Sequence, residues 1–268
     1  MKHFFDILEL RNGPLFIFGG CNILAALFFL LMTRFSNKRV RGANVWFKPF
    51  KFALSIAVFS WTMGWYTYEL NAPVPVGLYT WAAIVLLGFE IIYIALQAGR
   101  GLTSHYNSSS ALYSFLAAMM GIAAAIVTLW TGYIGIIFCI ADLPSLPGYY
   151  VLSIRIGILL FVFFAFQGAS MGSRQTPTVG GPEGGPALPV LNWSTRYGDL
   201  RIAHFIGMHA LQVLPLLSWY VFTNTTATAI LGLIYALLAV FILVRALKGK
   251  PLITIRRWDM SINKDQII

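Results

Sequence analysis

The sequence predicts an all-α integral membrane protein, a single bundle of seven transmembrane helices. Apolar residues make up 58% of the 268-residue chain and charged residues only 10%, unlike a soluble domain. Apolar segments of about 20 residues, long enough to cross ~30 Å of hydrocarbon, recur along the chain. Basic residues gather in alternate connections between these segments. The predicted spans are approximately 14–34, 50–70, 77–97, 111–140, 148–170, 202–222 and 226–247.

The distribution of Lys and Arg predicts the orientation of the bundle. Of the 19 Lys and Arg residues, 16 fall in alternate connections, whereas 71–76, 141–147 and 223–229 contain none. The positive-inside rule then places the N-terminus outside and the C-terminus in the cytoplasm, and we expect a bacterial cytoplasmic (inner) membrane. Because the net charge of +10 follows the loops instead of forming a patch, we expect the lipid bilayer as a partner and no nucleic acid.

The ends and connections follow from local signals. Residues 2–11 form a short amphipathic stretch with Asp6 and Glu9, unlike a cleavable signal peptide, and predict an interfacial segment outside the bundle. The span 111–140 is longer than a bilayer requires, which predicts a tilted helix or a break near Gly132. The connection 171–200 is rich in Gly and Pro and predicts a flexible cytoplasmic loop.

Polar residues inside the spans predict a site, because a charged side chain costs roughly 2.5–3.5 kcal/mol at the centre of a membrane helix. The sixth span carries His204 and His209, and the third carries Glu90. The topology places these residues, and others near the same helix ends, in the cytoplasmic half. Their convergence predicts a pocket that opens to the cytoplasm. The expected catalytic residues are His209, His204 and Glu90, and the expected ligand-binding residues are Arg100, His105, Gln97, Arg174, Arg201, Gln212 and Lys51.

The histidines suggest a metal or haem b, but their spacing limits the geometry. His105, His204 and His209, with Glu90 or Asp199, supply enough ligands for one divalent ion, and two histidines supply enough for haem b. His204 and His209 are five residues apart, so on a straight helix they point about 140° from each other. We therefore expect them on either side of a face that carries Arg201 and Gln212.

The sequence leaves three classes of function open. The first is a membrane-bound enzyme or redox protein that binds haem, a metal or an anionic lipid-like ligand from the cytoplasmic side. The second is a transporter or channel for a small solute or ion, and the third is a receptor or a structural subunit of a membrane complex. Outside the pocket, Arg155 lies within the fifth span and is expected to form an ion pair with Asp142 or Glu69, the alternative being that its charged end extends outward to the membrane boundary.

Overall fold

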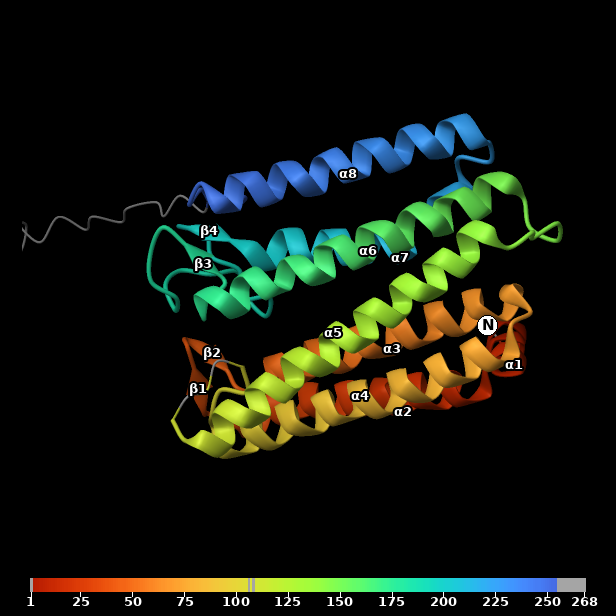
Figure 1. Ribbon diagram of the computed structural model, residues 1–268. Coiled ribbons are helices and arrows are strands. Elements are labelled where there is room, and N and C mark those ends of the chain that lie inside the picture. The colour runs from red at the N-terminus through yellow and green to blue at the C-terminus, as the bar shows by residue number, and fades with distance from the viewer. Residues whose placement is uncertain (1, 106, 108, 255–268) are drawn as a thin grey trace, which may run out of the picture.

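The computed structural model describes residues 2–105, 107 and 109–254, and these form the elongated helical bundle of Figure 1. The all-α class predicted from the sequence is confirmed. The described helices are α1 (Lys2–Arg11), α2 (Gly13–Phe35), α3 (Phe47–Thr67), α4 (Pro73–Arg100), α5 (Ala111–Ile140), α6 (Gly148–Arg174), α7 (Leu200–Tyr220) and α8 (Thr225–Leu247), with one 3₁₀ turn, η1 (Tyr68–Leu70). The short strands are β1 (Arg39–Val40), β2 (Ala43–Asn44), β3 (Thr178–Val179) and β4 (Gly198–Asp199).

Six helices of the described chain are long and apolar enough to cross a membrane, which is the architecture of an integral membrane protein. They are α2, α4, α5, α6, α7 and α8. The helix α3 has 21 residues but is not among the six. It is also well enclosed by its neighbours, because only Leu54 and Ser55 of its residues are exposed. A helix that shows little surface to lipid does not need an apolar outer face, so polar residues are tolerated along it.

The helices form two groups that a single helix connects (Figure 1). The N-terminal group contains α1 to α4, the C-terminal group contains α6 to α8, and α5 runs diagonally from one to the other. Since α5 is continuous from Ala111 to Ile140, its length is taken up by tilt and not by a break near Gly132. The groups are joined through Phe59 and Phe161, whose ring centroids lie 5.2 Å apart, and through a 2.9 Å hydrogen bond from the Tyr66 hydroxyl to the Leu211 carbonyl.

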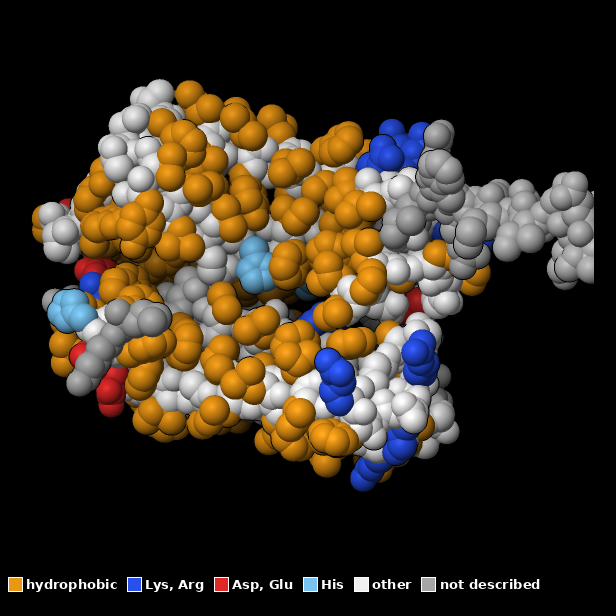
Figure 2. Space-filling model, turned by 180° about the vertical axis from the view of Figure 1, so that it is seen from behind, with side chains coloured by type: hydrophobic (Ala, Val, Ile, Leu, Met, Phe, Trp, Pro, Cys, Tyr) orange, Lys and Arg blue, Asp and Glu red, His pale blue; other side chains and the backbone are white. Residues whose placement is uncertain are grey.

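One end of the bundle, here called the basic end, carries the four strands and the connections 36–46, 101–110 and 175–199. Figure 2 shows most Lys and Arg side chains of the visible face gathered there. Arg256, Arg257 and Lys264, which the sequence assigns to the same side, lie outside the described residues. Within the predicted loop 171–200, α6 continues to Arg174 and β3 pairs antiparallel with β4.

At the opposite end, α1 is fastened to the bundle through Arg11. Its guanidinium forms a 2.6 Å ion pair with Glu69, donates to the Trp65 carbonyl at 3.0 Å and lies 4.1 Å from the centre of the Trp65 ring. Leu8 on the same helix is fully buried. The segment expected outside the bundle is therefore a helix packed against its end.

The ion pair expected for Arg155 is wrong, because neither carboxylate meets it in the described chain. Glu69 pairs with Arg11. The Arg155 Nε atom instead donates to the carbonyl of Phe138 at 2.9 Å. That carbonyl belongs to the last turn of α5, where carbonyl groups have no partner within the helix. Arg155 therefore supplies a missing donor at a helix C-terminus, where a positive charge is also favourable.

Candidate functional site

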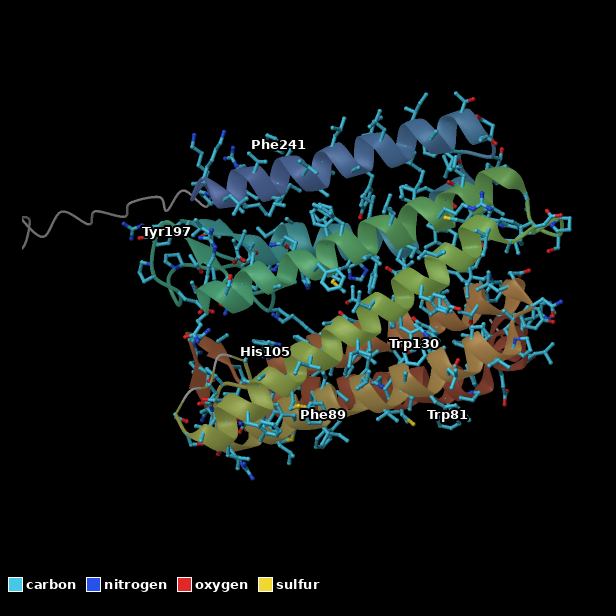
Figure 3. All side chains as sticks on the ribbon, in the orientation of Figure 1. Trp81, Phe89, His105, Trp130, Tyr197 and Phe241 are labelled. Carbon is cyan, nitrogen blue, oxygen red and sulfur yellow. The ribbon has the colours of Figure 1, made fainter. Side chains whose placement is uncertain are left out.

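Two lysines and a histidine form a polar cluster at the basic end. The Lys48 Nζ atom lies 3.0 Å from His105 Nδ1, and the Ser104 hydroxyl lies 3.3 Å from the same nitrogen. The Lys51 ammonium donates to the Leu191 carbonyl at 2.9 Å. We call Lys48, Lys51 and His105 the basic cluster. Figure 3 shows the labelled His105 at this end of the molecule, beside the space between the two groups of helices.

Lys48 is the member of the basic cluster that sequence reasoning missed. Its position before the predicted span 50–70 indicates a connection between spans, whereas the structure places it in the first turn of α3. The available signal was its spacing of three residues from Lys51, since positions three apart share one face of a helix.

The environment of His105 favours its neutral form. Burial holds the pKa of His105 well below its usual value, and the positive charges of Lys48 and Arg41 lower it further. Since an ammonium group only donates, Nδ1 accepts the hydrogen bond from Lys48. A ring nitrogen that accepts from a lysine is not available to a metal, so His105 is better suited to orienting Lys48.

Replacing Lys48 should therefore change the titration of His105. In the unaltered protein we expect the ring to be neutral at the pH, near 6.5, at which an ordinary histidine titrates. In Lys48→Gln the pKa of His105 should rise, because one of the charges that lowers it has been removed. Histidine NMR titration measures this change, and an unchanged curve would contradict the contact. Arg174→Gln, an exposed site at the same end, serves as the control.

Neither lysine of the basic cluster has a carboxylate partner. Among the described residues, the ion pairs within 4.0 Å are Arg11–Glu69, Arg41–Glu183 and Arg201–Asp199. Arg201 is thus already engaged, and it also donates to the Asn192 carbonyl. Glu183 and Glu90 act on Lys48, and Asp199 acts on Lys51, only over longer distances. A partly buried ammonium group without a close counter-charge is unfavourable unless an anion approaches it.

The basic cluster lies where the N-terminal group meets the connection 175–199. Arg41 in the turn between β1 and β2 forms a 2.6 Å ion pair with Glu183, and Lys51 contacts Leu191. Both contacts reach from the N-terminal group to the segment between α6 and α7. They join the groups at the basic end, while the aromatic and apolar contacts join them further along the bundle.

The two histidines of α7 have different partners, in keeping with the divergence expected from their spacing. His204 Nδ1 donates to the Phe164 carbonyl at 2.7 Å. Its ring also fills the space beside Gly168, where an added Cβ would lie 2.9 Å from it. His209 Nδ1 lies 3.1 Å from Gln212 Oε1. His204 therefore ties α7 to α6, and His209 belongs to a second contact on another side of the helix.

The remaining predicted residues are dispersed. Glu90 is buried in α4, and its carboxylate has no hydrogen bond or ion pair among the described residues. Gln97 is fully buried and donates to the Tyr93 hydroxyl at 2.8 Å, which leaves its Oε1 atom without a partner in the described chain. Arg100 and Arg174 are exposed.

The structure does not gather the three histidines proposed as metal ligands. Within the described ranges, no group of three or more His, Cys, Asp or Glu side chains is close enough to hold a metal ion. Asp199, the other acidic ligand considered, caps α7 and pairs with Arg201.

A shallow apolar groove of about 560 Å³ runs along α6. It is lined by Leu159, Val162, Phe163 and Phe166, with the Gln167 amide at the side nearer the basic end. The Oε1 atom of Gln167 has no hydrogen-bond partner among the described residues. The groove therefore combines an apolar wall with one unsatisfied polar group.

Comparisons of the chain with protein families, with curated proteins and with solved structures each give no match.

Proposed function

We propose that this protein is a seven-span membrane protein whose basic end faces the cytoplasm and binds the anionic head group of a membrane amphiphile. The observation that carries the proposal is the pair of partly buried lysines, Lys48 and Lys51, without a carboxylate partner among the described residues. A phosphate or carboxylate head group would supply the missing charge.

The seventh span in this proposal is α3. Its 21 residues reach about 30 Å, the thickness of the hydrocarbon layer. Its absence from the six most hydropathic helices is consistent with its enclosed position. The lysines lie in its first two turns, near a membrane boundary. Lysine side chains at such a position extend their charged ends towards the polar layer.

The orientation in this proposal follows from the charges. The basic end carries the large majority of Lys and Arg, and the positive-inside rule assigns that end to the cytoplasm. An anionic lipid of the inner leaflet would then lie at the depth of the basic cluster. The attraction is worth about 1 kcal/mol for each lysine near the membrane surface.

The groove on α6 supports an amphiphile rather than a small soluble anion. Its apolar wall is suited to an acyl chain. Phe163 and Phe166 are exposed in the described structure, so a chain could enter sideways from the bilayer. The proposal stops at binding, because His204, one of the expected catalytic residues, is held by the Phe164 carbonyl.

Binding of anionic lipid to single variants tests the proposal. In nanodiscs of phosphatidylcholine, the protein should bind a fluorescent short-chain phosphatidylglycerol in preference to the matched phosphatidylcholine. Lys48→Gln and Lys51→Gln should each weaken that binding roughly fivefold, as expected for loss of about 1 kcal/mol.

Arg174→Gln is the matched control, since Arg174 carries the same charge at the same end but is exposed and lines neither the cluster nor the groove. Its affinity should equal that of the unaltered protein. Equal losses in all three variants would mean that only the overall charge matters, and the proposal would then be rejected. An absence of preference for phosphatidylglycerol would reject it as well.

A further inference from the structure

A line of hydrogen bonds connects α3 to α7 and ends on His209. The Thr62 hydroxyl lies 2.7 Å from the carbonyl oxygen of Val58. Gln212 Nε2 lies 3.2 Å from Thr62 Oγ1, and Gln212 Oε1 lies 3.1 Å from His209 Nδ1. One backbone group and three side chains are therefore connected by consecutive hydrogen bonds.

The Val58 carbonyl fixes the direction of this line, because a carbonyl can only accept. The Thr62 hydroxyl donates its one hydrogen to that carbonyl, so it accepts from Gln212 Nε2. The Gln212 carbonyl oxygen is then the acceptor for His209 Nδ1. No carboxylate of the described residues forms an ion pair with His209, so we expect its imidazole to be neutral. A neutral imidazole carries one proton. That proton lies on Nδ1, and Nε2 presents a lone pair.

The Nε2 atom has no hydrogen-bond partner among the described residues, and the side chain is partly exposed. Around it the surface is aromatic: the Phe205 ring lies 4.3 Å from the His209 ring, and Trp193 meets Phe205 edge-on at 5.5 Å. A hydrogen-bond acceptor in such a surface is unfavourable in lipid unless a donor reaches it.

We propose that His209 Nε2 accepts a hydrogen bond from the hydroxyl group of an uncharged membrane lipid whose chain lies against Phe205 and Trp193. An anionic head group would be repelled by the lone pair, and a cationic one finds no carboxylate in contact with the ring. A hydroxyl group is an uncharged hydrogen-bond donor that membrane lipids carry. The site is distinct from the basic cluster, because Thr62 lies 11 residues beyond Lys51 on α3, roughly 16 Å along the helix axis.

Nitrogen NMR of the histidine rings, in phosphatidylcholine nanodiscs, tests both parts of the proposal. Before any ligand is added, His209 should show a protonated Nδ1 and a non-protonated Nε2. Adding 1,2-dioleoylglycerol should shift the Nε2 resonance in the direction of an accepted hydrogen bond. The methyl ether of the same lipid, in which a methyl group replaces the hydroxyl hydrogen, should bind about tenfold more weakly.

Gln212→Leu separates the directed hydrogen bond from the mere presence of His209. With the acceptor removed, the ring should exchange between its two tautomers, and the affinity for dioleoylglycerol should fall severalfold although His209 is unchanged. Thr62→Val removes the group that orients the amide and tests the same point if Gln212→Leu does not fold. Thr128→Val is the matched control, because its hydroxyl also donates to a helix carbonyl, that of Ala124, but supports no glutamine.

Two results would overturn the proposal. One is a protonated Nε2 in the unaltered protein, since the lone pair would then be absent. The other is equal binding of dioleoylglycerol and its methyl ether, since the hydroxyl would then contribute nothing.

Discussion

Asp199→Ala should destabilise the protein more than any other single change considered. Asp199 is almost fully buried, accepts from the Ser194 backbone N–H at 2.8 Å and pairs with Arg201 at 2.6 Å. It also accepts from the Arg201 backbone N–H as the N-cap of α7. Removing it leaves Arg201 without a counter-charge, and we expect a loss of about 3–5 kcal/mol in the free energy of unfolding. The apparent Tm in detergent should fall by roughly 10 °C.

Thermal unfolding followed by tryptophan fluorescence measures this effect, with two variants for comparison. Asp199→Asn keeps an oxygen that can cap the helix but loses the charge. Its Tm should therefore lie between that of Asp199→Ala and that of the unaltered protein. Asp142→Ala removes an exposed carboxylate at the opposite end and should change stability by less than about 0.5 kcal/mol. If both alanine variants unfolded at the same temperature, Asp199 would not hold the connection 175–199 to α7.

Gly157→Leu should have the next largest effect, because it inserts a side chain where α6 and α7 nearly touch. A Cβ at Gly157 would lie 3.1 Å from the Ala210 carbonyl oxygen and 3.2 Å from Leu211 Cα. Both are backbone atoms, so the helices must separate. The same movement would strain the hydrogen bond from Tyr66 to the Leu211 carbonyl. We expect a loss of about 1–3 kcal/mol, typical of an overpacked interface, and Tm measurements in detergent would detect it.

Gly172→Leu provides the control on the same helix. A Cβ at Gly172 meets nothing within 4 Å. Leucine also favours a helix over glycine by up to about 1 kcal/mol, so this variant should be as stable as the unaltered protein or slightly more stable. Similar destabilisation in both variants would show that the loss of a glycine matters, and not the approach of the two helices.

The helical architecture could be predicted from the sequence because its determinants are local. An apolar run of about 20 residues is sufficient to predict a membrane helix. The length of the segment ending at Ile140 predicted either a tilt or a break, and the structure shows one continuous helix. The divergence of His204 and His209 followed from the helical rotation between them, and the structure gives them different partners.

The contacts between helices could not be predicted in the same way, because they depend on how distant segments meet. Arg155 was expected to pair with a carboxylate, but it donates to the Phe138 carbonyl at the end of α5. Asp199 was considered as a metal ligand, but the fold places Arg201 and Ser194 around it. Lys48 belongs to the site because its Nζ atom lies beside His105 Nδ1, a contact that the sequence does not indicate. Lys48 and His105 are 57 residues apart in the sequence, and the partner of Arg155 is a backbone carbonyl, which has no side-chain signal. Asp199 contacts residues close to it in the sequence, but their orientation depends on the turn before α7.

The enclosed position of α3 also has a consequence for how the protein enters a membrane. A segment with this composition is a weak candidate for insertion alone, since it carries two lysines and is not among the six strongly apolar helices. It is joined to α2 by the short β1–β2 hairpin, and the Trp61 side chain donates to the Phe16 carbonyl of α2 at 3.0 Å. We expect α2 and α3 to insert together as one helical hairpin. A truncated chain that lacks α2 should then leave α3 outside the bilayer during synthesis.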